Sequence, residues 1–145
     1  GCDCGCTNTE VNCTCPDPTG IEAARIENIV SADLGGGGVN ISGAGYTYTL
    51  YTNTSSNTQR VYVQTNMYIT CTVTHSINTT YLVNGIPAPT GSIMYEELAT
   101  TKTDFTHFLI AATVPAAGVI AIKVISDNAN GVLNNLTSFI YKHDI

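Results

Sequence analysis

Three apolar runs that close the chain constrain its fold more than any other feature. The runs are Phe105–Ala112, Val119–Ile125 and Leu136–Tyr141. In the middle run Ile120, Ile122 and Val124 alternate with smaller or polar residues, which is the period-two pattern of a strand with one buried face. Short turns of small and polar residues separate the runs, and no helical pattern intervenes. The runs therefore predict antiparallel strands that together form the closing sheet of a β-sandwich.

Composition extends this prediction to the rest of the chain. Only 11% of the 145 residues are charged, and Thr, Asn and Ser alternate with Tyr, Val and Ile over long stretches. Such β-branched and aromatic side chains fit a pleated surface, so an all-β fold is expected. Further strands are predicted at Arg25–Ser31, Gly45–Asn53, Gln59–Asn66, Met67–His75, Thr79–Val83 and Gly91–Glu96. About eight or nine antiparallel strands with hairpin spacing predict a single jelly-roll β-sandwich over residues 21–145, although residues 21–34 also fit a short helix.

The charge balance argues against two classes of function. Eleven acidic and five basic residues give a net charge of −6, whereas nucleic-acid binding needs clustered Lys and Arg to displace counterions. No apolar run reaches the length of a membrane span. The chain begins at Gly1 rather than Met, so we expect a leader or a longer N-terminal region before it.

The first 20 residues are predicted to be an extended, Cys-rich N-terminal arm. They hold five of the six cysteines, which are Cys2, Cys4, Cys6, Cys13 and Cys15. The arm has neither a strand period nor a helix period, and Pro16 and Pro18 interrupt any regular element. A segment of this kind cannot build a core of its own, so we expect its cysteines to hold it in place.

The cysteines allow several bonding patterns. Their Cys-x-Cys spacing is narrower than that of most structural zinc sites, which favours disulfides in an extracellular setting over a metal. Bridges within the arm are one alternative. A second is a bridge from an arm, of the same subunit or a neighbouring one, to Cys71, which is predicted to share a strand face with Ile69 and Val73. A third leaves Cys71 as a buried free thiol, and the sequence does not fix the connectivity.

Five Asn-x-Ser/Thr sequons are candidate glycosylation sites on an exposed surface. They are Asn12, Asn40, Asn53, Asn78 and Asn135. Because a Thr-rich chain also forms such triplets by chance, the presence of glycans is left open.

The sequence lacks a recognisable pattern for catalysis, a cofactor or a metal ion. His75, His107 and His143 occur singly in or beside predicted strands, and His107 is expected in the interior or at an interface. Asp127 is expected in a plain turn, because the full spacing of a calcium loop is absent. No Gly-x-Ser-x-Gly motif occurs. We therefore expect a protein that is not an enzyme and that holds no cofactor.

Tyrosines in the predicted strands have two interpretations. The residues are Tyr46, Tyr48, Tyr51, Tyr62, Tyr68 and Tyr81. One interpretation is an aromatic platform for sugars. The other is rings buried in the body or against a neighbouring subunit with the hydroxyl in water, and this second use is favoured because it is the commoner one for strand tyrosines.

The order of strands and turns resembles that of known jelly rolls. The segments 114–118 (VPAAG), 119–124 (VIAIKV) and 137–142 (TSFIYK) resemble the C-terminal half of tumour-necrosis-factor-like domains, and residues 83–87 resemble a hairpin of spore exosporium glycoprotein heads. The resemblance implies Greek-key connections and a trimeric head, as in those glycoproteins and in phage fibres. A Cys-bearing arm before a small jelly roll is also similar to bacterial endospore appendage subunits. In those subunits the arm bonds to the next subunit, but through adjacent cysteines that this arm does not have.

These observations predict a non-enzymatic extracellular structural subunit that self-assembles into a surface appendage, filament or fibre. Arm cysteines would cross-link its copies, with Cys71 as the acceptor, because a head-to-tail contact that does not close produces a filament. The alternative is the trimeric head of a phage or spore-surface fibre that binds a receptor or a glycan. The expected partners are copies of the same chain, with glycans in addition, at a cell, spore or virion surface.

Overall fold

The computed structural model describes residues 25–88, 93–98 and 101–145, with side chains described for 28–88 and 104–145. Within this part every regular element is a β-strand. The strands are β1 Arg25–Ser31, β2 Val39–Asn40, β3 Tyr46–Thr52, β4 Gln59–Cys71, β5 His75–Val83, β6 Ile86–Pro87, β7 Ile93–Leu98, β8 Thr101–Val114, β9 Val119–Ser126 and β10 Val132–Asp144. No helix in the described ranges is long and apolar enough to cross a membrane.

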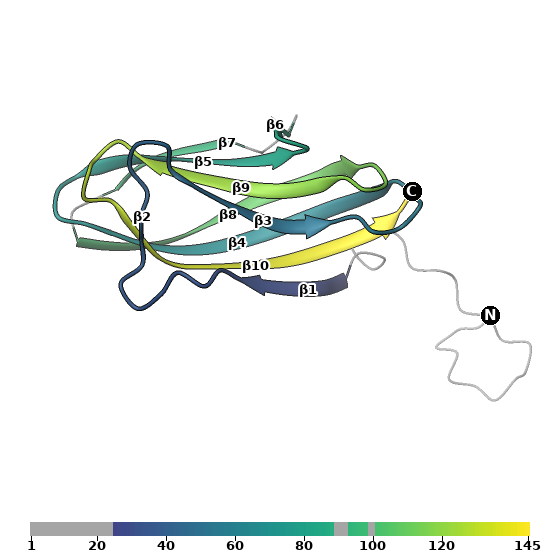
Figure 1. The fold of residues 1–145 in the computed structure, drawn as a ribbon, viewed down its shortest axis with the longest axis horizontal. Coiled ribbons are helices and arrows are strands. Elements are labelled where there is room, and N and C mark those ends of the chain that lie inside the picture. The colour runs from purple at the N-terminus through teal and green to yellow at the C-terminus, as the bar shows by residue number, and fades with distance from the viewer. Residues whose placement is uncertain (1–24, 89–92, 99–100) are drawn as a thin grey trace, which may run out of the picture.

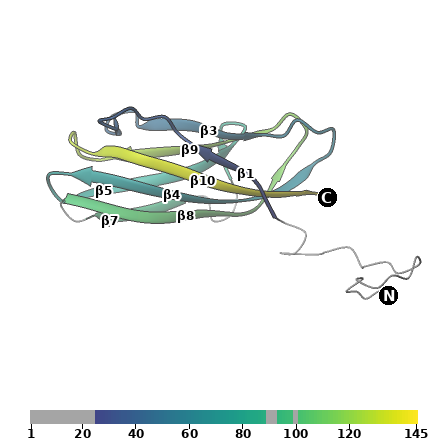
Figure 2. The same ribbon diagram turned by 90° about the horizontal axis from the view of Figure 1, so that it is seen from below.

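The strands form two antiparallel five-stranded sheets that pack face to face (Figure 1). In sheet A the order is β1-β10-β4-β8, and β2 pairs with the start of β10. In sheet B the order is β3-β9-β5, and β7 and β6 follow each other along the other side of β5. Figure 2 shows the strands of both sheets running along the same long axis of the molecule. The sandwich therefore has two broad outer faces, one for each sheet.

The strand order confirms the jelly-roll prediction. Long strands that follow one another in sequence alternate between the two sheets, apart from β5 and β7, which pair within sheet B. This alternation is the double Greek-key arrangement of a jelly roll. The hairpin predicted at residues 83–87 is also present, because Val83 of β5 pairs with Ile86 of β6 across the Asn84-Gly85 turn.

The prediction that the three closing runs share one sheet is wrong. Strands β8 and β10 lie in sheet A on either side of β4, whereas β9 lies in sheet B between β3 and β5. The turns on either side of β9 therefore cross from one sheet to the other. Period-two alternation determines which face of a strand is buried, and in a sandwich the inner face of either sheet satisfies it.

Strand β4 is a single strand where the sequence predicted two. Buried and part-exposed positions alternate without a break along Gln59–Cys71, with Asn66 facing outward and Met67 facing the core. The strand ends at Cys71, and Val73 lies in the bend that follows, 42% exposed. Val73 therefore does not share the buried face of Cys71 as predicted.

The inner faces of both sheets supply one apolar core. Its largest fully buried side chains are Tyr81, Ile41, Ile69, Ile77, Leu109, Ile120, Ile122, Leu133, Leu136, Ile140, Val61 and Val63. Burial of one large apolar side chain stabilises a fold by roughly 1.5–3 kcal/mol. The prediction that Ile120, Ile122 and Val124 face the core is confirmed, because all three are 0% exposed.

A polar network lies inside this core. The Tyr81 hydroxyl is 2.7 Å from both the Thr65 hydroxyl and the His107 carbonyl oxygen. Thr65 also bonds the Ser138 hydroxyl at 2.8 Å within sheet A, and the two Tyr81 hydrogen bonds link sheet B to sheet A. Burial raises the pKa of Tyr81 above its ordinary value, so the phenol remains protonated. His107, 6% exposed, lies in the interior as expected.

Strand β8 contains a bulge. Ala111 has a φ of 57°, in the left-handed region, and the pairing of β4 with β8 shifts register between Val61 and Val63 at this point.

Strands β1 and β10 form an antiparallel pair at one side of sheet A. Arg25 of β1 lies opposite Lys142 of β10, so the described chain enters and leaves sheet A at the same end (Figure 1).

Candidate functional site

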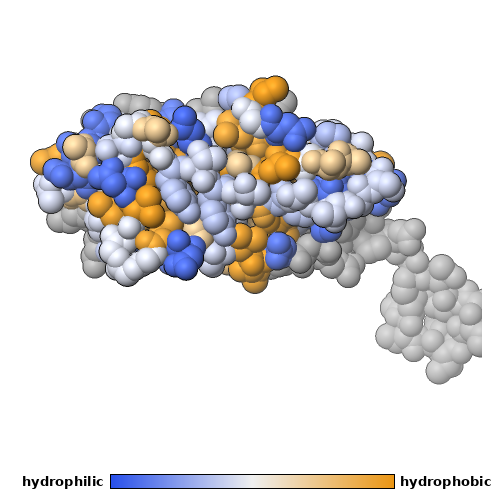
Figure 3. Space-filling view, viewed as in Figure 1, coloured by the Kyte–Doolittle hydropathy of each residue, from blue (hydrophilic) through white to orange (hydrophobic). Residues whose placement is uncertain are grey.

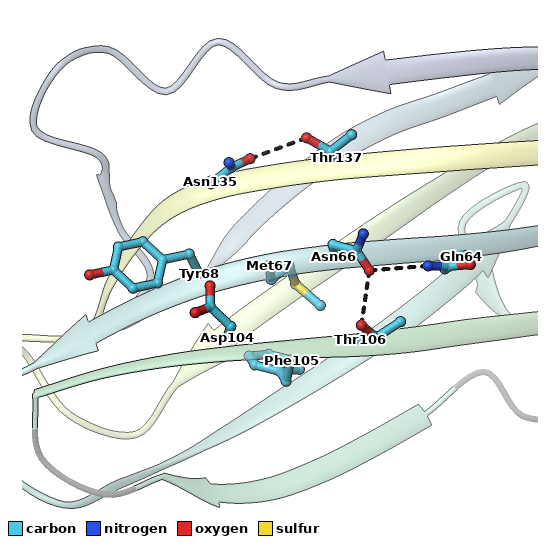
Figure 4. Close-up of a pocket in the computed structure, with 9 residues that line it drawn as sticks. All are labelled: Gln64, Asn66, Met67, Tyr68, Asp104, Phe105, Thr106, Asn135 and Thr137. Atoms are coloured by element: carbon cyan, nitrogen blue, oxygen red, sulfur yellow. Dashed lines mark hydrogen bonds between the residues drawn. The ribbon is translucent and has the colours of Figure 1, made fainter.

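A hollow of about 590 Å³ lies on the outer face of sheet A (Figure 4). Its lining residues are Gln64, Asn66, Met67, Tyr68, Asp104, Phe105, Thr106, Asn135 and Thr137. They come from three neighbouring strands, β10, β4 and β8. Because side chains alternate along a strand, the polar members face outward, while Met67 and Phe105 lie beneath them on the core side.

The register of sheet A places four polar side chains in a line across its strands. Thr137 of β10 and Thr106 of β8 lie on either side of Asn66 of β4, and Ser31 of β1 continues the line beyond Thr137. We call these four residues the polar row. Neighbouring strands are ~4.8 Å apart, so the row presents one polar group at about that interval.

Hydrogen bonds fix the side chains of the polar row. The Thr106 hydroxyl donates to Asn66 Oδ1 at 2.9 Å, and Gln64 Nε2 donates to the same oxygen at 3.4 Å (Figure 4). The Ser31 and Thr137 hydroxyls bond each other at 3.1 Å. With Oδ1 occupied, the Nδ2 group of Asn66 has no acceptor among the described residues and remains available to donate hydrogen bonds.

Aromatic side chains lie on both sides of the polar row. On one side Tyr68 is paired with Asn135 and Asp104 across the strands. On the other side lies what we call the phenylalanine row, formed by Ile29, Phe139, Gln64 and Phe108. Two of its members are strongly exposed, with Ile29 at 57% and Phe108 at 50%. Both side chains therefore add apolar surface to the outer face of sheet A.

The hollow carries little charge. Among the lining residues whose side chains the structure describes, Asp104 is the one carboxylic acid, and none is Lys, Arg or His. Arg60 and His143 lie opposite each other on the same face but farther along β4 and β10. Arg60 is six residues from Asn66, which is ~20 Å along a strand. The described lining residues can therefore donate and accept hydrogen bonds, and Asp104 is the charged side chain among them.

A buried Ser-His pair lies away from this face, at one end of the sandwich. His75 Nδ1 is 2.7 Å from the Ser126 hydroxyl, and the two side chains are only 4% and 3% exposed. Burial lowers the pKa of His75, and the neighbouring Asp127 opposes this shift. The Asp127 carboxylate accepts a hydrogen bond from the Ser76 backbone N–H at 2.8 Å, within the predicted turn. Both side chains of the pair are therefore almost completely covered by the fold.

Of the six cysteines, the structure describes only Cys71. Cys71 is buried, 5% exposed, and its thiol lies 3.6 Å from Asn128 Oδ1 without a disulfide to any described residue. Cys2, Cys4, Cys6, Cys13 and Cys15 lie outside the described residues, so the predicted bridges stay predictions. Among the described side chains, no three His, Cys, Asp or Glu residues are placed to hold a metal ion.

Sequon asparagines differ in their surroundings. Asn53 is 0% exposed, and its Nδ2 donates to the carbonyl oxygens of Asn57, Val114 and Pro115 at 2.8, 3.1 and 3.1 Å. The expectation of an exposed sequon therefore fails at Asn53, because its amide nitrogen is enclosed in the folded protein. Of the others, Asn40 and Asn135 are exposed, Asn78 is partly exposed and Asn12 lies outside the described residues.

Asn135 is the sequon that coincides with the hollow. Its side chain is exposed beside Tyr68, and its Oδ1 accepts a hydrogen bond from Thr137 at 3.2 Å. A glycan attached to Asn135 would fill the space above the polar row. Glycosylation at this position and ligand binding in the hollow therefore exclude each other.

The sequence singles out two residues of this site. Tyr68 belongs to the tyrosines that suggest an aromatic platform for sugars, and Asn135 is a sequon, whereas Asn66, Thr106 and Asp104 carry no such signal. The alternation of Gln64, Asn66 and Tyr68 along one strand is a signal that places them on a shared face. The pairing of β4 with β8 and β10 brings Asp104, Thr106 and Asn135 beside them. These pairings join distant segments, which a single sequence does not show.

Comparison with known proteins gives no family. No family model and no curated protein matches the chain. Among solved structures it is similar to an exo-β-1,3-galactanase from Phanerochaete chrysosporium with galactose, at 17% identity and a TM-score of 0.42. This match covers 79% of the chain but only 30% of the galactanase chain.

Two smaller proteins are similar over most of their length. The EclA C-terminal domain, a sugar-binding protein, has 12% identity and a TM-score of 0.35, with 92% of this chain and 84% of that chain covered. A CBM4 structure has 14% identity and a TM-score of 0.34, with coverages of 81% and 82%. Since none of the three is a tumour-necrosis-factor-like domain or a spore appendage subunit, those resemblances stay predictions.

Proposed function

We propose that the protein is a non-enzymatic glycan-binding module and that the hollow on sheet A is its binding site. One observation carries the proposal. Amide and hydroxyl groups that are fixed by mutual hydrogen bonds lie beside the partly exposed ring of Tyr68 in a hollow with one charged side chain among its described lining residues, and the exposed ring of Phe108 lies at the next outward position of β8. This is the combination that recognises a sugar.

A sugar ring offers two kinds of surface, and the hollow has a counterpart for each. The hydroxyl groups of a sugar donate and accept hydrogen bonds, as the amides of Asn66 and Gln64 also do. The C–H groups of a sugar form an apolar face that an aromatic ring such as Tyr68 or Phe108 can cover. A few fixed polar groups beside apolar surface are what orients a small ligand in a pocket.

The content of the hollow supports binding without hydrolysis. Glycoside hydrolysis ordinarily requires a pair of carboxyl groups on either side of the bond to be cleaved. Among the described residues that line the hollow, Asp104 is the one carboxylate. The proposal also places the protein outside the cell, where glycans and disulfides are both found.

The test is an Asn66→Ala variant measured by glycan array and isothermal titration calorimetry. Loss of hydrogen bonds worth ~1.5 kcal/mol is expected to weaken glycan binding about tenfold. The matched control is Asn78→Ala on the outer face of sheet B, where Thr80 donates to Asn78 Oδ1 at 2.8 Å. Wild-type protein that binds no glycan, or equal losses in both variants, would contradict the proposal.

A second candidate function is the assembly of copies into a filament or a closed head. It is favoured by an apolar hollow of about 550 Å³ between β6 and β8, at the lateral edge of the sandwich. Ile86 and Ile110 line it at 68% and 59% exposed, and none of its lining residues is ionisable. Figure 3 shows apolar colour in separate patches on a largely hydrophilic surface. Exposed apolar patches of this kind favour contact with another protein surface.

Gel electrophoresis with and without reductant tests this second function. A ladder of multimers that collapses on reduction supports covalent assembly through the arm cysteines, with Cys71 as the proposed acceptor. A discrete trimer under native conditions, insensitive to reductant, supports a closed head. A monomer under every condition contradicts both forms of assembly and leaves the glycan proposal untouched.

A further inference from the structure

On the outer face of sheet A, similar polar side chains recur from one strand to the next, whereas the outward side chains along a single strand differ. Across the strands, the polar row places a hydroxyl or amide on each of β1, β10, β4 and β8. Along β4 the outward side chains change instead, from Tyr68 through Asn66 and Gln64 to Tyr62 and Arg60. A ligand built of identical units would therefore find equivalent partners only if it crosses the strands.

The spacing of the rows suits a sugar chain in that direction. Strands are ~4.8 Å apart, which is close to the length that one pyranose unit adds to an extended chain. The phenylalanine row runs parallel to the polar row, one outward position along each strand, and carries Phe139 and Phe108 on either side of Gln64. Each unit would place its hydroxyl groups on the polar row and part of its apolar face toward the phenylalanine row.

Charge limits the kind of unit. Asp104 lines the hollow, and the polar and phenylalanine rows contain no ionisable side chain. An acidic sugar would meet a carboxylate without a compensating cation in either row. Neutral sugar units avoid this repulsion.

From this arrangement we infer that the ligand is a chain of several neutral sugar units that lies across the strands of sheet A along the polar row. The inference rests on the proposed glycan-binding function and specifies its ligand class and direction. Binding should use Thr137 and Thr106 at two ends of the contact and Asn66 between them. A single sugar would engage only part of the row.

The test measures calorimetric affinities for cello-, manno- and galacto-oligosaccharides from the monosaccharide to the hexasaccharide. Affinity is expected to rise up to the trisaccharide or tetrasaccharide and then to level off. Thr106→Val and Thr137→Val should weaken binding of the longer oligomers about fivefold, which is ~1 kcal/mol, and leave the monosaccharide and disaccharide nearly unchanged. Asn66→Ala should weaken binding at every length.

Two controls on the same face test the direction. Thr113→Val changes the same kind of side chain on β8, opposite Arg60 rather than in the polar row. Tyr62→Ala removes an aromatic ring farther along β4. Neither variant should alter binding, whereas a loss in Tyr62→Ala equal to that in Thr106→Val would show a chain lying along β4 and overturn the inference.

The remaining outcomes separate the inference from the proposed function. Monosaccharide affinity equal to hexasaccharide affinity, or tighter binding of oligomers that contain uronic acid, would overturn the inference while glycan binding stands. Failure of every oligosaccharide to bind would remove both. A rise in affinity with length that Thr106→Val and Thr137→Val abolish would support the inference.

Discussion

At the scale of single residues, Asn53 shows how one buried amide joins separate loops. Its Nδ2 donates to carbonyl oxygens of Asn57, Val114 and Pro115, and its Oδ1 accepts from the Ser55 backbone N–H at 3.0 Å. The loop after β3 and the turn after β8 are therefore held by the same side chain. The sequon rule reads three consecutive residues, so it cannot detect this tertiary role, and the sequence predicted Asn53 on the surface.

Asn53→Ala is expected to destabilise the fold by about 2–3 kcal/mol, because it leaves buried carbonyl groups without donors. The measurement is the free energy of unfolding from urea denaturation. Asn78→Ala is the control, since Asn78 is partly exposed and its loss should cost no more than ~1 kcal/mol. Equal destabilisation in the two variants would show that the enclosed amide contributes nothing special.

His75 gives the stability a defined pH dependence. Burial lowers its pKa below the ordinary value of 6.5 despite the nearby Asp127, so the unfolded chain takes up a proton at a higher pH than the folded one. The contribution is present in full above about pH 6.5 and is lost as the pH falls through 6.5 toward the lower folded-state pKa. The urea midpoint should therefore be lower at about pH 5 than at about pH 7.

The comparison variant for His75 is His75→Asn, which keeps a polar group near Ser126 but does not titrate. Its urea midpoint should depend less on pH over the same range. Parallel curves for the wild type and the variant would show that His75 is not responsible for the pH dependence.

At the scale of elements, the bulge in β8 stores local strain at Ala111. A non-glycine residue in the left-handed region costs roughly 1–2 kcal/mol, whereas glycine in a regular strand costs about 0.5–1 kcal/mol relative to alanine. Ala111→Gly should therefore stabilise the protein by up to ~1 kcal/mol, and Ala121→Gly in the regular strand β9 should destabilise it by a similar amount. The two variants are expected to change the free energy of unfolding, measured by urea denaturation, in opposite directions. A change in the same direction in both variants would contradict the strain at Ala111.

Strand positions were predictable to the extent that alternation is local. The run Val119–Ile125 became β9 with nearly the same bounds, because Ile120 and Ile122 set the buried face without help from other segments. The partner of each strand was not predictable, and β9 lies in a different sheet from β8 and β10. The hollow on sheet A depends on those partners, which is why the sequence points to Tyr68 but not to Thr106.

At the scale of the whole molecule, the described strands bury one shared core among themselves, so we predict that the sandwich folds without the arm. Deletion of residues 1–20 is expected to leave the far-ultraviolet spectrum and, under reducing conditions, the free energy of unfolding unchanged within ~0.5 kcal/mol. A truncated chain that fails to fold would contradict the division into arm and sandwich.

Oxidising conditions extend this experiment to the proposed bridge. If an arm cysteine bonds Cys71 within one chain, the full-length protein should gain roughly 2–4 kcal/mol over the truncated one. Cys71→Ser should remove that gain. A gain that persists in Cys71→Ser would show that the stabilising bridge does not use Cys71.

The shared exit point of β1 and β10 has a mechanical consequence. Arg25 faces Lys142 at the end of sheet A where the described chain enters and leaves. A pull on the two chain ends would therefore load the β1–β10 ladder one hydrogen bond at a time, like opening a zipper, instead of loading all its bonds in shear. A domain pulled in this way is expected to yield at a lower force than one whose ladder is loaded in shear.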